Sequence, residues 1–190
     1  MLSHDNLCFS AQVLLNEQTK DSASWGPEDR IVSYLPLSHI AGLVVDVVIQ
    51  LSTGGCVYYA RPDALQGTLT LSLQWARPTI FFAVPRVWEK FEEKMKDLAA
   101  SKPQIVQNIS GWAKNLGAQQ VQANMKKKDG PLCFNVANFL ILKRIKQALG
   151  LDQAKVFIYG AAPLKQSTND YFASLSMPLF NCYGMSETTA

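Results

Sequence analysis

Short runs of almost continuously apolar residues alternate along the chain with longer segments whose apolar residues recur at helical spacing. The short runs predict strands covered on both faces, because they lack the polar alternation of a half-exposed strand. The predicted strands are residues 31–35, 56–60, 79–84, 155–159 and 179–183. The predicted helices are residues 6–18, 40–52, 69–76, 87–100, 104–125, 134–149 and 166–175. Repetition of strand, helix and strand predicts an α/β fold with a mostly parallel sheet and crossover helices.

The helix predicted at residues 87–100 shows an amphipathic pattern in detail. Glu92 stands four residues before Lys96, so we expect the two side chains to pair on the side away from the core. The core-facing side is predicted to consist of Trp88, Phe91, Met95 and Leu98. We expect that side to serve packing and not ligand binding.

Length and composition describe one globular domain of 190 residues, of which 48% are hydrophobic and 17% charged. The net charge of +3 is too small to imply a nucleic-acid partner, so that class is rejected. No apolar run reaches the roughly 18 residues that a membrane-spanning helix requires. The longest, residues 40–51, contains Asp46 and predicts a buried helix of a soluble protein.

The four cysteines stand far apart, and neither histidine lies near one of them. This spacing argues against a zinc site and against a disulfide framework, and it favours a reducing compartment. We therefore expect a cytoplasmic protein. Peripheral contact with the endoplasmic reticulum or with other membranes stays open.

Candidate chemistry follows the strands, because ligands of parallel sheets bind at the carboxyl ends of the strands. After residues 31–35, Ser38 and His39 stand where a helix begins, and Ser38 is a natural helix cap. A local hydrogen bond of His39 is the simpler alternative to a role in a site. After residues 79–84, Pro85 and Arg86 open a helix, and a purely structural helix start explains them equally well.

Two further clusters are richer in chemistry. Gly160, Ala161 and Ala162 let a flat ligand approach the backbone, although a tight turn would select the same small residues. Residues 183–188 combine an aromatic ring, a glycine, hydroxyls and a carboxylate just beyond a strand. Hydroxyls can bind phosphate oxygens, and a carboxylate can hold a magnesium ion.

Taken together, these motifs resemble the adenylate-forming family of acyl-CoA synthetases, acyl-activating ligases and luciferases. Residues 1–6 resemble the segment after the glycine-rich phosphate loop of that family, and residues 34–39, 160–164 and 183–187 resemble its Y-L-P-L-x-H, G-x-A-P-L and Y-G-x-T-E segments. Residues 84–90 are similar to the long-chain fatty acyl branch. Ser186 in place of threonine, preceded by Met185, resembles bubblegum-type acyl-CoA synthetases.

The resemblance implies a reaction and roles for residues. ATP and a fatty acid give an acyl-adenylate and pyrophosphate, and coenzyme A then displaces AMP. Tyr183 is expected to stack on adenine, and His39 to lie near the acyl carboxylate and the thiol route. Ser186 is expected to contact the α-phosphate and Glu187 to hold Mg²⁺. The other expected nucleotide-binding residues are Gly160, Ala161, Ala162, Gly184, Met185 and Thr188.

The resemblance also implies that residues 1–190 are part of a large AMP-binding domain that is truncated at both ends. The phosphate loop, a ribose-binding aspartate, the hinge and a catalytic lysine of the family have no counterpart here. We therefore expect the isolated chain to be inactive, and its cut sheet to expose edges that promote aggregation.

Two alternatives remain open. The chain could be a natural, non-catalytic short form that binds nucleotide or a protein partner. It could also bind a membrane surface through the helix at residues 134–149, where a basic strip of Lys143, Arg144 and Lys146 borders apolar residues. Those apolar residues are Phe134, Ile141, Ile145 and Leu149. A helix packed on the sheet, with a solvated basic edge, is the favoured explanation of that pattern.

Overall fold

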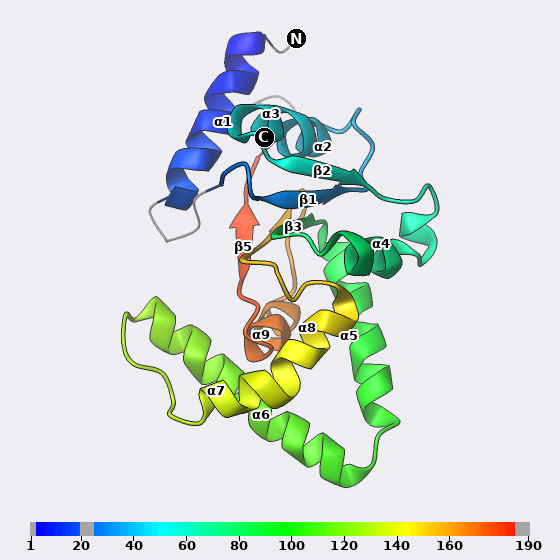
Figure 1. Ribbon diagram of the computed structural model, residues 1–190, viewed down its shortest axis with the longest axis vertical. Coiled ribbons are helices and arrows are strands. Elements are labelled where there is room, and N and C mark those ends of the chain that lie inside the picture. The colour runs from blue at the N-terminus through cyan, green and yellow to red at the C-terminus, as the bar shows by residue number, and fades with distance from the viewer. Residues whose placement is uncertain (1–2, 20–24, 185–190) are drawn as a thin grey trace.

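A computed structural model describes residues 3–19 and 25–184 and shows two parallel sheets (Figure 1). One pairs β1 (Arg30–Ser33) with β2 (Cys56–Tyr59). The other has the order β3 (Ile80–Ala83), β4 (Val156–Gly160) and β5 (Leu179–Cys182). All five predicted strands are present in these places, and the prediction of a mostly parallel α/β architecture is confirmed.

Thr79 ties the two sheets together at the amino ends of their strands. Its backbone N–H donates to the carbonyl of Arg30 at 2.9 Å, and its own carbonyl accepts from the N–H of Lys155 at 2.7 Å. Its hydroxyl donates to Asp29 Oδ1 at 2.6 Å inside the protein. Because these groups are buried and partnered, the junction fixes where β1, β3 and β4 begin.

One continuous helix connects β1 with β2. It consists of α2 (Ile40–Gly42), the π-helical segment η1 (Leu43–Val48) and α3 (Ile49–Thr53), and the left-handed residue Gly54 ends it. The first helix, α1 (His4–Thr19), packs against η1 and α3. Together they form the helical layer near β1 and β2 in Figure 1. The helices predicted at residues 6–18 and 40–52 are thus confirmed.

The main core lies between the three-stranded sheet and α5 (Pro85–Ala100), with Trp88 at its centre. The indole is fully buried, meets the ring of Phe172 edge to face at 4.8 Å, and donates from Nε1 to the carbonyl of Ile158 at 3.3 Å. Other helices around this core are α4 (Leu69–Ala76), which follows the short 3₁₀ turn η2 (Ala64–Gln66), and α9 (Gln166–Ser174).

Two details of the α5 prediction change. Leu98 is 57% exposed, so the core-facing side ends before the last turns of the helix. Glu92 pairs with Lys96 at 2.5 Å as predicted, but its side chain is buried and not on a solvent face. The pairing stabilises the buried carboxylate and holds the pKa of Glu92 below its usual value, although burial acts in the opposite direction and is the larger influence on that pKa.

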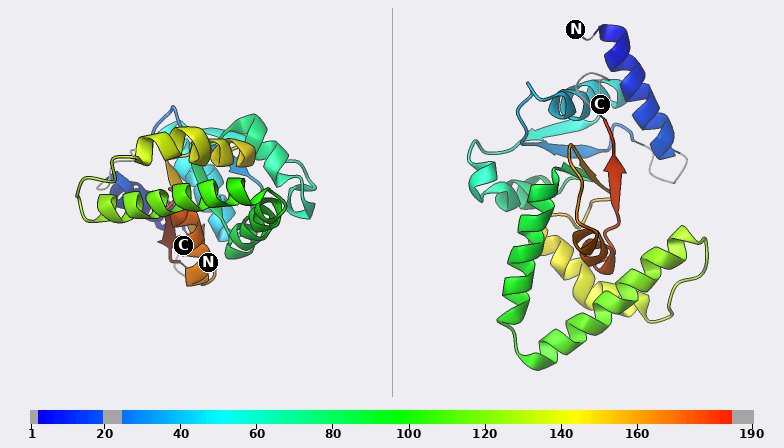
Figure 2. Two further views of the ribbon diagram at one scale, coloured as in Figure 1. Left: turned by 90° about the horizontal axis from the view of Figure 1, so that it is seen from below. Right: turned by 180° about the vertical axis from the view of Figure 1, so that it is seen from behind.

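A second helical layer lies at the end of the molecule away from the carboxyl ends of β4 and β5 (Figures 1 and 2). It contains α6 (Gln104–Met125), α7 (Phe134–Ala137), the π-helical η3 (Asn138–Leu142) and α8 (Lys143–Leu149). In the described ranges 3–19 and 25–184, no helix is long and apolar enough to cross a membrane.

The apolar residues on which the sequence-based membrane alternative relied face the protein interior. Phe134, Ile141, Ile145 and Leu149 all belong to or pack against the main core. Lys146 also turns inward, where Nζ donates to the carbonyl of Ser176 at 2.8 Å and burial lowers the pKa of the lysine to about 8. The membrane surface proposed from those residues is therefore wrong, and the favoured packing of this helix on the core is confirmed.

Candidate active site

The carboxyl ends of β4 and β5 bring two of the sequence motifs together. In the parallel register, Gly160 at the end of β4 lies opposite Cys182 at the end of β5. The turn with Ala161 and Ala162 therefore leaves the sheet beside Tyr183. Both segments lie at the edge where parallel sheets bind ligands.

Gly160 is required by close packing. A Cβ at this position would lie 2.8 Å from the carbonyl oxygen of Cys182 and 3.2 Å from Phe82 Cε2. The next residue, Ala161, has a left-handed backbone with φ of +69°, which is unfavourable for a residue with a Cβ. The strand therefore ends abruptly and leaves Ala161 and Ala162 exposed, which gives a flat group access to the backbone.

Tyr183 supplies the aromatic surface next to this turn. Its side chain is 81% exposed, although it directly follows a strand whose first residue, Leu179, is buried. An exposed ring beside small residues is suited to stacking on a planar base. The other residues predicted in this motif are Met185, Ser186, Glu187 and Thr188, and they lie outside the described residues.

His39 is the N-cap of the helix after β1, which corrects the expectation that Ser38 has this role. The Nδ1 atom of His39 accepts a hydrogen bond from the N–H of Ala41 at 3.2 Å, and the side chain is exposed. This is the local hydrogen bond that the sequence left as the simpler alternative. It occupies Nδ1, so that Nε2 is the nitrogen available to a ligand.

Asp46 is a buried carboxyl that the sequence analysis noted only as a charge within an apolar segment. It lies in η1, hydrogen-bonds the side chain of Ser33 at the end of β1, and lines a cavity of about 10 Å³ between β1 and β3. Burial raises the pKa of Asp46 to about 6, and the hydrogen bond from Ser33 opposes that rise. A lone acid within an apolar helix was the available signal.

Tyr34, which also lines this cavity, links the ends of the two sheets. Its hydroxyl donates to the carbonyl of Phe82 in β3 at 3.4 Å, and burial raises the pKa of the phenol. With Asp46 on Ser33, this contact fixes the start of the loop that leads from β1 to His39. The cavity is polar on one side only, and its volume suits about one water molecule.

Arg86 stays outside this arrangement. Its side chain is 67% exposed and pairs with Glu89 at 3.4 Å on the same helix. Pro85 occupies the first turn of α5, where the missing N–H costs nothing. The structural explanation of this motif is sufficient.

The sequence matches, over residues 1–190, the family model described as AMP-binding enzyme. The chain belongs to the AMP-binding enzyme family. This agrees with the resemblance to adenylate-forming enzymes that the motifs indicated.

Several curated relatives match the whole chain of this family member. Long-chain-fatty-acid–CoA ligase ACSBG2 of Xenopus laevis is 42% identical over 198 residues, which cover 100% of this chain and 26% of that protein. The ligase of the same name from Homo sapiens is 38% identical over 193 residues, with 100% and 28% covered. Long-chain-fatty-acid–CoA ligase ACSBG1 of Rattus norvegicus is 36% identical over 190 residues, with 100% and 26% covered. The chain thus spans about a quarter of the length of these relatives.

Solved structures of adenylating enzymes share the fold. Apo MatB from Rhodopseudomonas palustris superposes with a TM-score of 0.57 at 22% identity, and covers 98% of this chain and 26% of its own. The adenylation domain of a carboxylate reductase from Mycobacterium chelonae gives 0.51 at 25% identity, with 82% and 20% covered. These likenesses confirm the α/β fold of an AMP-binding enzyme.

The described residues suit a nucleotide better than a metal ion. The turn after Gly160 and the exposed ring of Tyr183 form an accessible, largely uncharged surface at the strand ends, as a planar base requires. Within residues 3–19 and 25–184, no group of three or more His, Cys, Asp or Glu side chains could hold a metal ion. The carboxylate predicted to do so, Glu187, follows this surface in the sequence.

Proposed function

We propose that the protein containing this chain activates long-chain fatty acids. The carboxylate would attack the α-phosphate of ATP to give an acyl-adenylate and pyrophosphate, and the thiol of coenzyme A would then displace AMP to give the thioester. The observation that carries the proposal is the meeting of the Gly160 turn with Tyr183 at adjacent strand ends. It is supported by 42% identity, over the whole chain, to a long-chain-fatty-acid–CoA ligase.

In this proposal the surface at the ends of β4 and β5 binds the adenine. Tyr183 stacks on one face of the base, and the backbone of Gly160, Ala161 and Ala162 borders it. Gly184 keeps the chain slim where it turns away from the strand. Met185 and Thr188 complete the nucleotide site, in the segment that the family resemblance assigns to it.

Charge is the main obstacle of the first step, because an anionic carboxylate must approach a polyanionic triphosphate. Mg²⁺ supplies Lewis-acid neutralisation of the phosphates when it is bound, and Glu187 is the residue we assign to hold it. The Ser186 hydroxyl donates to an α-phosphate oxygen. The remaining work is positioning, which needs little general-base help.

His39 is assigned to the acyl side of the site. It stands at the carboxyl end of β1, in the loop that Ser33 and Tyr34 anchor. With Nδ1 engaged by the helix N-terminus, Nε2–H can donate to the acyl carboxylate.

We further propose that residues 1–190 form part of a larger AMP-binding domain, because the relatives are about four times as long. The groups of the family that lack a counterpart in the chain would then come from other segments of the polypeptide. Cys8, Cys56, Cys133 and Cys182 are free thiols, three of them exposed, which supports a reducing compartment such as the cytoplasm.

The test is palmitate-dependent exchange of pyrophosphate into ATP, measured beside palmitoyl-CoA synthesis, with the longest natural polypeptide that contains this sequence. Tyr183→Ala should raise the KM for ATP at least about tenfold, because stacking on a base contributes roughly 1–3 kcal/mol, while Tyr183→Phe should retain most affinity. Tyr59→Ala, which removes another exposed tyrosine, is the matched control. Absence of fatty-acid-dependent exchange in the parent protein would refute the proposed activity and favour a non-catalytic binding role.

A further inference from the structure

The basic residues of this chain are strongly segregated. Residues 101–150 contain eight Lys or Arg and a single acid, Asp129, so this segment carries a net charge of +7. The other residues contain ten Lys or Arg and fourteen Asp or Glu, a net charge of −4. The modest overall charge of +3 therefore hides a basic segment, and that segment contains the whole layer of α6, α7, η3 and α8.

The same layer exposes large apolar side chains. On α6 they recur at helical spacing, and on α7 and η3 they occupy the side opposite the core-facing residues. The exposed residues are Ile105, Ile109, Trp112, Val136, Phe139 and Leu140, which are 44–72% accessible. Phe139, at 70%, is as exposed as a phenylalanine on a flexible peptide end. A contiguous apolar surface of this kind marks an interaction site.

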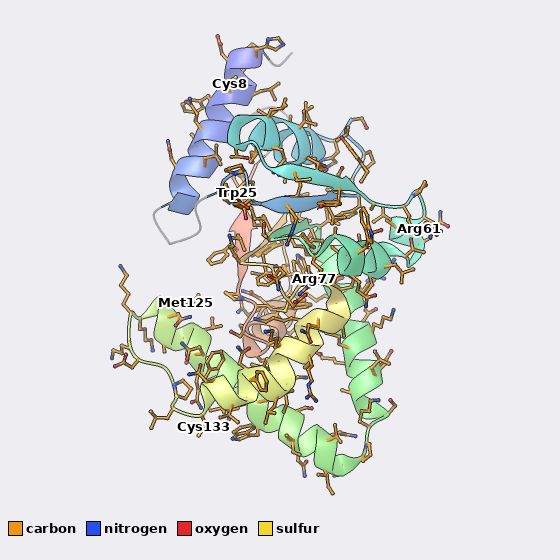
Figure 3. All side chains as sticks on the ribbon, viewed as in Figure 1. Cys8, Trp25, Arg61, Arg77, Met125 and Cys133 are labelled. Atoms are coloured by element: carbon orange, nitrogen blue, oxygen red, sulfur yellow. The ribbon has the colours of Figure 1, made fainter. Side chains whose placement is uncertain are left out.

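Basic and apolar residues also alternate in the loop that joins α6 to α7. Met125 and Leu132, which are 74% and 99% exposed, flank the exposed run Lys126, Lys127 and Lys128. Met125 and Cys133 in Figure 3 mark the two sides of this loop, which protrudes from the molecule. Seen from below in Figure 2, α6 lies beside the helix formed by α7, η3 and α8, so that the two present one broad surface.

We propose that this surface, defined as the exposed side of residues 104–149, docks on an anionic lipid bilayer. Its aromatic and aliphatic side chains would enter the boundary between headgroups and acyl chains, and its lysines would pair with anionic headgroups. Lys126, Lys127, Lys128, Lys143 and Arg144 are all exposed and available for this role. Lys146 is not, because it bonds the carbonyl of Ser176.

The apolar side chains decide between a membrane and a nucleic acid as the partner. Phosphate backbones require basic groups but gain little from Phe139, Leu140 or Leu132, whereas a bilayer uses both kinds of side chain. The location fits as well, because this surface lies at the opposite end from the carboxyl ends of β4 and β5 (Figure 1). Docking would therefore leave the nucleotide surface accessible, and the inference does not depend on the proposed reaction.

The experiment is flotation of the longest natural polypeptide that contains this sequence with vesicles of phosphatidylcholine, alone or mixed with phosphatidylserine. Flotation separates bound protein from aggregates, which sink. We expect binding to the mixed vesicles to exceed that to neutral vesicles at least about tenfold at low salt, and to weaken as salt is added.

Matched pairs of variants locate the surface. Lys127→Gln with Lys128→Gln should reduce binding roughly tenfold or more, and Lys90→Gln with Lys94→Gln, on α5, should not. Phe139→Ser should weaken binding, whereas Phe9→Ser, which alters a ring of nearly equal exposure on α1, should leave it unchanged. Vesicles with brominated acyl chains should quench tryptophan emission, and Trp112→Phe should remove part of that quenching.

Four results would overturn the proposal. They are equal binding to neutral and anionic vesicles, equal losses in the control variants, and salt-sensitive binding to an RNA oligonucleotide without vesicle binding. The fourth is binding by the 190-residue chain but not by the longer polypeptide, which would show that other protein segments cover the surface.

Discussion

Asp46 illustrates how a single buried residue sets a local energetic cost. Its carboxylate gives up bulk solvation within η1 and regains one hydrogen bond from Ser33, so the folded state favours the protonated form. The hydrogen bond joins η1 to the end of β1, close to the loop that presents His39. Stability is therefore given up at a position that helps to shape the candidate site.

The pKa of Asp46 predicts a pH dependence of folding. Because the folded pKa of about 6 lies above the ordinary 3.8, this group favours the folded state fully below pH 3.8, and the benefit is lost as the pH rises through 6. At pH 7 the cost is about 3 kcal/mol. Asp46→Asn, whose amide oxygen can still accept from Ser33, should raise the free energy of unfolding at pH 7 by up to that amount.

Urea denaturation at pH 5 and pH 7 measures this effect. The gain from Asp46→Asn should shrink at pH 5, whereas Asp97→Asn, on the exposed side of α5, should change stability little at either pH. An equal effect of Asp46→Asn at both values would mean that the carboxyl is better solvated than its burial indicates.

The two candidate catalytic side chains should fail in different ways. In the longest natural polypeptide, Glu187→Ala should depress ATP–pyrophosphate exchange by several kcal/mol of barrier, because the loss of Mg²⁺ affects adenylation itself. His39→Ala should act mainly on the use of the acid or of the thiol. If Glu187→Ala left exchange near the parent value while thioester synthesis fell, the metal assignment would be wrong.

At the level of elements, α6 contains two glycines with opposite packing. Nothing lies within 4 Å of a Cβ built on Gly111, whereas a Cβ on Gly117 would lie 2.1 Å from the carbonyl oxygen of Ser174 in α9. The first glycine therefore only weakens the helix, and the second allows α6 and α9 to approach each other closely.

This contrast predicts substitutions of opposite sign. Gly111→Ala should stabilise the protein by roughly 0.5–1 kcal/mol through helix propensity. Gly117→Ala should destabilise it by about 1–3 kcal/mol, because α9 must move. Thermal unfolding followed by circular dichroism compares the two. A stabilising Gly117→Ala would show that the contact between α6 and α9 is looser than this geometry.

The sequence predicted these elements well, and the failures have physical causes. Strands buried on both faces have an apolar pattern that needs no tertiary context, which explains why β3 and β4 were found. The π-helical turn around Asp46 and the exposure of Leu98 depend on what packs against each helix, and periodicity does not contain that information. Ser38 and His39 are both plausible caps, and only the backbone geometry at residue 39 decides between them.

For the candidate site, sequence order predicted which motifs come together but not how. A parallel sheet places consecutive strand ends at one edge, so the proximity of the Gly160 turn to Tyr183 followed from topology. The steric need for glycine beside Cys182 and the left-handed backbone of Ala161 required coordinates. The polar contacts of Tyr34 and Asp46 join segments whose pairing no local pattern specifies.

At the scale of the whole molecule, exposed apolar side chains occur on several faces besides the proposed membrane surface. Leu51 on α3, Tyr59 at the end of β2 and Trp75 on α4 are 69–81% exposed, and the outer edge of β2 pairs with no other described strand. A chain that spans about a quarter of its relatives would bury such surfaces against other segments of the longer protein. Alone, it presents them to water or to another copy of itself.

We therefore predict that the isolated 190-residue chain self-associates. Its apparent mass in light scattering should rise with concentration, and it should bind the dye ANS, because apolar surface and an open strand edge are both available. Replacing Leu51 and Trp75 with serine should reduce both signals, since these side chains make few packing contacts to lose. The longer polypeptide should show neither behaviour. A monomeric radius combined with a sharp, cooperative melt of the short chain would mean that its exposed faces are tolerated in water, and that the 190 residues form a self-sufficient unit.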